Sequence, residues 1–160
     1  MTETPDGRAS FTLEAIGSGR KVDLSAPGRS VLLICFAQET QDGIEEVEAA
    51  ARRRFATADE LLVGHVIDLH KVPGLLRKVA EGVLAGEHRK AVEALPAGQE
   101  PDDYVVILPD WDGAGVRRLG LEDATQALGL ALLRADGSIA WRYQGPDPAA
   151  ALAARLASPV

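Results

Sequence analysis

Three apolar runs along the chain predict buried strands of one sheet. They cover residues 30–37, 61–70 and 104–110, and polar, turn-forming residues bound each of them. Continuous apolar runs of this length are typical of strands that are covered on both faces. A helical pattern separates the first two runs, and the order strand, helix, strand predicts a parallel pair joined by a crossover.

That helical pattern lies between residues 42 and 55. Its apolar side chains recur every three or four residues and form one stripe, which consists of Ile44, Val47, Ala51 and Phe55. We expect Asp42 to cap the helix N-terminus, with Glu45 reaching back from three residues further on. The arginines at 52–54 suit the negative end of the helix dipole.

Alternating residues predict two hairpins. The first covers residues 11–24 and turns at "GSGR", and the second covers residues 127–145 and turns at residues 135–137. A last helix is predicted to start at Asp147 as the cap, with Pro148 at its first position.

The region from residue 72 to residue 121 has a less regular pattern. Residues 72–95 predict one interrupted helix or two, with a break at 85–87, and their apolar stripe belongs to the core, to a lid or to a contact with a second subunit. Residues 97–103 predict a polar loop, and residues 113–121 predict a short helix or turn.

Length and charge narrow the classes of function. A chain of 160 residues fits a single domain over 1–160, in which we expect residues 1–9 to be flexible. The net charge of -7 opposes binding to nucleic acid. Neither a leader peptide nor an apolar run long enough to span a membrane is evident, so we expect a cytoplasmic protein that does not bind a membrane.

The predicted order of elements resembles the thioredoxin-like superfamily, in particular its peroxiredoxin and TlpA-like branch. Residues 11–36 resemble the family's opening hairpin and central strand, residues 107–121 its aspartate, glycine and small helix, and residues 132–145 its last hairpin. The resemblance spans about residues 11–157. It implies an α/β fold in which helices flank a central mixed sheet, with an N-terminal hairpin and a helical insertion.

The chain departs from this family at its two chemical signatures. The resemblance implies a catalytic cysteine at the start of the helix after the central strand, where a helix N-terminus lowers a thiol pKa. Residues 37–43, "AQETQDG", contain no cysteine. Leu128 stands near the place of the cis-proline that precedes the last hairpin in thioredoxin-type members.

Cys35 is the single cysteine of the chain, and it lies inside the first apolar run. A cysteine among aliphatic side chains behaves as a small, inert hydrophobe. The alternative, a redox role, requires an exposed sulfur with a lowered pKa. We therefore predict that the protein is neither a thiol-disulfide oxidoreductase nor a cysteine peroxidase.

Asp68 and His70 are the candidates for acid-base chemistry. The period of two along a strand places them on one side of the chain and His65 on the other. Both stand at the carboxyl end of the second apolar run, at the sheet edge where ligands tend to bind. An aspartate that orients a histidine is a common arrangement for proton transfer. The alternative is that they are only polar residues at a strand end.

The ligand-binding candidates at the same edge are Glu39, Thr40, Gln41, Asp42 and Trp111. Trp111 either lines a pocket or covers the end of the sheet. Asp110 and Asp112 invite comparison with a cation site that includes Asp102 or Asp103, but their spacing lacks the alternation of a calcium loop. We predict no metal site and no cofactor.

Two functions are compatible with these residues. The first is a redox-inactive domain that binds a small molecule or a protein partner, including a second copy in a homodimer. The second is an enzyme that uses Asp68 and His70 for proton transfer and the residues at 39–42 to contact its substrate.

Overall fold

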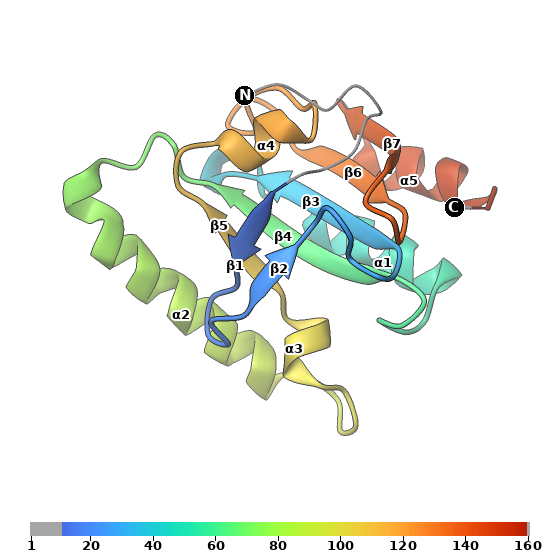
Figure 1. The fold of residues 1–160 in the computed structure, drawn as a ribbon, viewed down its shortest axis with the longest axis horizontal. Helices are drawn as coiled ribbons and strands as arrows, with labels where there is room; N and C mark the ends of the chain where they lie inside the picture. The colour runs from blue at the N-terminus through green and yellow to red at the C-terminus, as the bar shows by residue number, and fades with distance from the viewer. Residues whose placement is uncertain (1–10, 160) are drawn as a thin grey trace.

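A five-stranded mixed sheet forms the centre of the protein (Figure 1). The computed structural model describes residues 11–159, so the prediction for residues 1–9 lies outside the described residues. The strand order is β5 (Ile107–Asp110), β4 (Leu62–Asp68), β3 (Val31–Phe36), β6 (Gly129–Leu133) and β7 (Ile139–Gln144). β3, β4 and β5 run parallel, whereas β6 and β7 are antiparallel to their neighbours.

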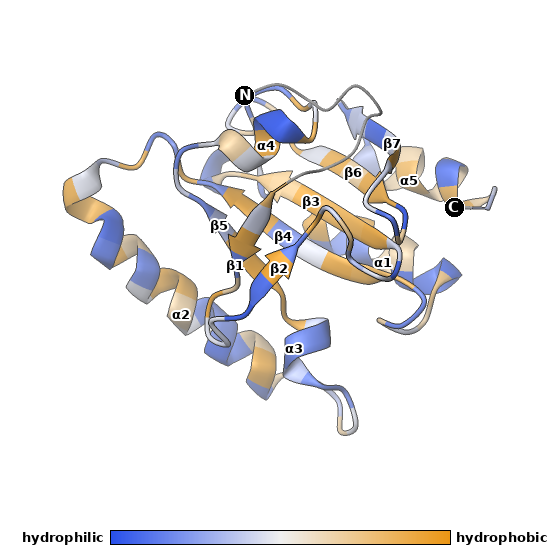
Figure 2. Cartoon of the chain, viewed as in Figure 1, coloured by the Kyte–Doolittle hydropathy of each residue, from blue (hydrophilic) through white to orange (hydrophobic). Residues whose placement is uncertain are grey.

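The two faces of the sheet are covered by different elements. On one face, Leu32 and Ile34 of β3 pack with α1 (Ile44–Arg54) and α5 (Pro148–Leu156). On the other face, Leu33 and Cys35 pack with the hairpin β1 (Thr12–Glu14) and β2 (Lys21–Asp23) and with α4 (Ala114–Arg118). Every residue of β3 is buried, as its apolar run predicts, and Figure 2 shows the apolar strands between these layers.

The ends of the helices test the predicted caps. The Asp147 carboxylate accepts a hydrogen bond from the Ala150 amide at the start of α5, and Pro148 is the first helical residue, so this cap is confirmed. The predicted Asp42 cap is wrong. Gly43 occupies the cap position of α1 with φ +95°, and no side chain caps that helix, because the left-handed turn places Asp42 outside it.

Two predictions for residues 72–104 are also wrong. α2 (Arg77–Glu93) follows a short 3-10 helix, η2 (Gly74–Leu76), and continues through the predicted break, because glycine lowers helix propensity by only about 1 kcal/mol. The predicted loop instead contains α3 (Pro101–Tyr104), where proline at the first position suits a helix start. β5 therefore begins at Ile107 rather than at Tyr104.

α2 carries apolar side chains on two faces. Leu84 is buried against Val105 and Ile107, which lie at the start of β5. Four other apolar side chains, from η2 and the first turns of α2, are exposed: Leu75 is 97% accessible, and Leu76, Val79 and Val83 are more than half accessible. We call these four residues the α2 stripe. None of the helices within residues 11–159 is both long and apolar enough to cross a bilayer.

Gly28 and Gly137 both have a positive φ, a backbone conformation that is strained for other residues, but only at Gly137 would a Cβ also collide with a neighbour. Gly28 (φ +80°) has open space where a Cβ would lie, whereas a Cβ on Gly137 (φ +86°) would collide with the Ser25 carbonyl oxygen. We expect Gly28→Ala to lower the free energy of unfolding by about 1–2 kcal/mol. Gly137→Ala should cost about 3 kcal/mol or more, because the second hairpin must move away from residue 25.

Denaturant unfolding of both variants measures this difference. Equal losses of stability in the two variants would contradict the predicted contact between the turn of the β6–β7 hairpin and the backbone of Ser25.

Candidate functional site

The carboxyl ends of the parallel strands gather polar side chains at one edge of the sheet. β4 ends at Asp68 and β5 ends at Asp110, and these two residues are paired in the sheet. β3 ends at Phe36, and a short 3-10 helix, η1 (Gln38–Thr40), follows it before α1. This edge is where clefts form in open α/β sheets.

Asp68 and His70 are in direct contact at this edge. The side chain of Asp68 is only 2% exposed, and its Oδ1 accepts a hydrogen bond from the backbone amide of His70. The same oxygen lies 2.6 Å from Nδ1 of the imidazole. Asp68 therefore fixes the ring and leaves Nε2 available on the other side.

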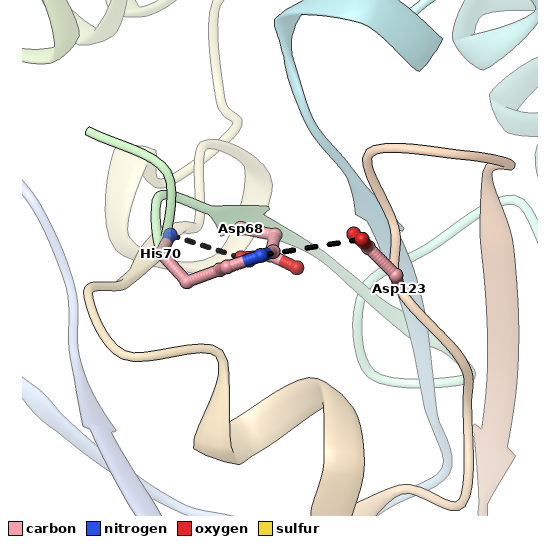
Figure 3. Close-up of side chains that lie close together, drawn as sticks. All are labelled: Asp68, His70 and Asp123. Carbon is pink, nitrogen blue, oxygen red and sulfur yellow. Dashed lines mark hydrogen bonds and ion pairs between the residues drawn. The ribbon is translucent and has the colours of Figure 1, made fainter.

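A third residue, Asp123, completes the cluster and was not singled out from the sequence (Figure 3). It lies in the loop between α4 and β6, and its Oδ2 is 4.0 Å from Nε2 of His70 and 3.9 Å from Nζ of Lys71. The ring thus lies between two carboxylates. One sequence signal could have pointed to Asp123: its position shortly before the last hairpin, at the sheet edge where the resemblance implies a site.

The charge of Asp123 is stabilised locally. The hydroxyl and the backbone amide of Thr125 both donate hydrogen bonds to its Oδ1. These bonds, with smaller contributions from Lys71 and His70, lower the pKa of the Asp123 carboxyl below its ordinary value of 3.8. The carboxylate is consequently charged at neutral pH.

A pocket of about 340 Å³ opens beside the cluster. Asp68, His70 and Asp123 line it together with side chains from α4 and from the loop before β6, which are Val116, Arg117, Leu121 and Glu122. The volume is at the lower end of the range for small-molecule sites.

The predicted residues at 39–42 do not line this pocket. Glu39, Gln41 and Asp42 are exposed. Thr40 has a structural role, because its hydroxyl donates to the Ala124 carbonyl at 2.6 Å and accepts from the Ala37 amide at 3.0 Å. Thr40 thereby joins the loop after β3 to the loop that carries Asp123.

Trp111 belongs to a different hollow. The guanidinium of Arg77 stacks over its ring at 4.4 Å, and both residues line a groove of about 940 Å³ between α2 and the N-terminal hairpin. The structure therefore places Trp111 against α2 and outside the pocket of His70.

The aspartates considered for a calcium-like site have other partners. Asp110 accepts hydrogen bonds from the amides of Gly115 and Val116 in α4, while burial raises the pKa of its carboxyl. Asp112 accepts from the Ala114 amide. Asp103 lies 2.7 Å from Arg29 in an ion pair. These carboxylates hold α4 and the loops in place.

Cys35 is fully buried in the middle of the sheet, and the carboxylates of Asp110 and Asp68 lie near enough to affect the pKa of its thiol. Burial raises the pKa of its thiol, and the two carboxylates raise it further. A neutral, inaccessible sulfur is neither a nucleophile nor a good metal ligand.

The other two histidines lie away from this edge. His65 is paired with Glu48 of α1 at 2.5 Å on the opposite face of the sheet. His88 of α2 is partly buried, because its ring fills the space beside Gly17 where a Cβ would lie.

Solved structures with the same fold are known. The chain is similar to the pneumococcal exposed lipoprotein thioredoxin Etrx1 from Streptococcus pneumoniae, with a TM-score of 0.59 and 18% identity over 93% of this chain and 98% of that one. It is similar to a putative thiol:disulfide interchange protein DsbE from Chlorobium tepidum, with a TM-score of 0.59 and 16% identity over 98% and 97%. For StoA from Bacillus subtilis the TM-score is 0.58, with 15% identity over 96% and 100%.

These comparisons establish the class of fold. The chain has the thioredoxin-like fold, with a mixed sheet, an N-terminal hairpin and flanking helices. Neither a protein-family model nor a curated protein matches the sequence. Within residues 11–159 every peptide bond is trans, and Leu128, which stands near the place where the resemblance implies a cis-proline, is buried.

The burial of Cys35 predicts a thiol that does not react in the folded protein. We expect the native protein to show no reaction with DTNB, and the protein unfolded in guanidinium to release one equivalent of the product per chain. The Cys35→Ala variant supplies the blank for both measurements. Rapid reaction of the native protein would contradict the closed packing around β3.

The contacts of Thr125 predict the acidity of Asp123. We expect Thr125→Val, which removes the hydroxyl but keeps the shape, to raise the pKa of Asp123 towards 3.8, as measured by carbon NMR titration of the carboxyl groups. In the wild-type protein the charged Asp123 carboxylate stabilises the fold at pH values above the pKa that this group has in the unfolded chain. This contribution is lost as the pH falls through the lower pKa of the folded protein.

Asp23 provides an internal control for this titration, because Ser25 lowers the pKa of its carboxyl in the same way. An unchanged pKa of Asp123 in Thr125→Val, or an equal shift at Asp23, would contradict the assignment.

Proposed function

We propose that this protein is a thioredoxin-like domain that does not exchange disulfides and that binds a small polar ligand beside Asp68, His70 and Asp123. The observation that carries the proposal is the imidazole of His70, which Asp68 holds at 2.6 Å while its Nε2 lies 4.0 Å from Asp123. Such a ring is oriented in advance, so a ligand does not have to order it.

The loss of disulfide exchange is supported by the sulfur chemistry. Exchange needs an accessible thiolate, and formation of an intramolecular disulfide needs a second thiol. The chain has one cysteine, which is fully buried with a raised thiol pKa. The edge that carries chemistry in the fold therefore presents carboxylates and an imidazole here.

The charges of the pocket favour a ligand with hydrogen-bond donors or positive charge. Asp68 and Asp123 flank His70, and Glu122 lies at the rim. Arg117 also lines the pocket, but it donates a hydrogen bond to the Asp112 carbonyl. Lys71 is the cation close to Asp123, and its side chain is more than half exposed.

Acid-base catalysis is the second candidate, and the contact between Asp68 and His70 favours it. A carboxylate at Nδ1 selects the imidazole tautomer and makes Nε2 the atom that exchanges a proton. A bound molecule with an exchangeable proton near Nε2 would be the substrate in that case.

Native mass spectrometry of the protein purified gently from its own host tests the proposal. We expect a stoichiometric ligand on the wild-type chain and on the control His88→Gln, whose ring lies on α2 beside Gly17. In His70→Gln and Asp123→Asn, occupancy should fall about tenfold, because each change removes one polar partner of the ligand. An equal occupancy in all four proteins would contradict binding at this pocket.

The fate of the ligand separates the two candidates. When the extracted ligand is incubated with fresh wild-type protein, unchanged recovery supports binding. Chemical conversion that His70→Gln abolishes, with folding intact, supports acid-base catalysis instead.

A further inference from the structure

We infer that the ligand of this site is a divalent transition-metal cation such as Zn²⁺, held by Nε2 of His70 and the carboxylate of Asp123. This inference rests on the proposed binding function and names the class of ligand. Asp68 orients the imidazole from the other side, and water occupies the remaining positions on the metal.

The distances between the three side chains are compatible with one ion. Ligand-type atoms of Asp68, His70 and Asp123 all lie within 4.8 Å of one another, and Nε2 of His70 is 4.0 Å from Oδ2 of Asp123 (Figure 3). Zinc binds nitrogen and oxygen at about 2.0–2.2 Å, so an ion fits between these two atoms. A tetrahedral angle needs them about 3.3 Å apart, and rotation of the partly exposed Asp123 side chain supplies that movement.

Asp68 supplies an orienting contact of the kind that histidine ligands have in metal proteins. Such histidines donate their second ring N–H to a carboxylate or carbonyl, which fixes the tautomer and raises the basicity of the coordinating nitrogen. Here Oδ1 of the buried Asp68 lies 2.6 Å from Nδ1 and also accepts the His70 backbone amide. Both contacts direct Nε2 away from Asp68 and towards Asp123.

The local charge independently favours a cation. Asp68 is paired in the sheet with Asp110, and both carboxyls are buried close together. Asp123 lies on the other side of the imidazole, with Lys71 at 3.9 Å. A divalent ion offsets the excess of carboxylates more effectively than an exposed lysine, whose ammonium is strongly hydrated.

The donor atoms indicate the kind of metal. An imidazole nitrogen with a carboxylate oxygen suits zinc, iron or nickel, whereas magnesium and calcium prefer oxygen ligands alone. With two protein ligands and the rest water, a metal here keeps open coordination positions facing the pocket. Open positions allow a bound metal to polarise a water or a substrate.

Titration of the full chain with ZnCl₂, followed by NMR of the histidine rings, tests the inference. The chain has three histidines, so each ring can be followed separately. We expect the signals of His70 to shift with saturation below about 1 mM zinc, and those of His88 to stay unchanged. The His65→Gln variant should bind equally well, which excludes the other histidine-carboxylate pair, His65 and Glu48, as the source of the shift.

Three variants make the test quantitative by calorimetry with ZnCl₂. Asp123→Asn and Asp68→Asn should each weaken binding about 10- to 100-fold, the first by loss of a ligand and the second by loss of the orienting contact. Lys71→Met should bind more tightly than the wild type, because the competing cation beside Asp123 is removed. A site elsewhere on the chain would give the same affinity in all three.

The outcomes separate this inference from the proposed function. If zinc leaves His70 unchanged at about 1 mM, or shifts His65 instead, the metal assignment is overturned. In that case, an organic ligand that mass spectrometry finds on the wild type and not on Asp123→Asn would support the proposed binding function without the metal. Zinc binding that depends on His70, Asp123 and Lys71 as described supports both.

Discussion

The parallel pairing of β3 with β4 is the constraint on which the rest of the structure depends. It is buried on both faces and brings the ends of β3, β4 and β5 to one edge of the sheet. Because the two strands run in the same direction, the chain must cross over between them through α1, which covers one face. The hairpin and α4 cover the other face, and the site lies where these layers leave the edge open.

The sheet edge at the carboxyl ends of β3, β4 and β5 carries polar side chains. The nucleophilic sulfur implied by the resemblance is absent from residues 37–43, and the remaining sulfur is sealed inside β3. Carboxylates and one imidazole stand at the neighbouring strand end instead. Thr40 ties the loop after β3 to the loop before β6, which carries Asp123.

The sequence allowed most of the fold to be predicted, because apolar runs and alternating positions report burial directly. The placement of Asp68 and His70 on one side of a strand also follows from the period of two. Local periodicity could not place Asp123 against His70, since that contact joins segments that are distant in the chain. The Asp42 cap was predicted incorrectly because the backbone angle of Gly43 decides that point and leaves no local pattern. The break in α2 was predicted incorrectly because a glycine costs a helix only about 1 kcal/mol.

The α2 stripe has a consequence for the distribution of stability along the chain. From residue 73 to residue 83 almost every side chain is exposed, and the stacking of Arg77 on Trp111 is a contact to the body of the protein there. Helical hydrogen bonds alone give little stability to so short a segment. Amide hydrogens in the first turns of α2 are expected to exchange by local fraying, whereas those near Leu84 should require a larger opening of the fold. We therefore expect the two halves of this one helix to belong to different cooperative units.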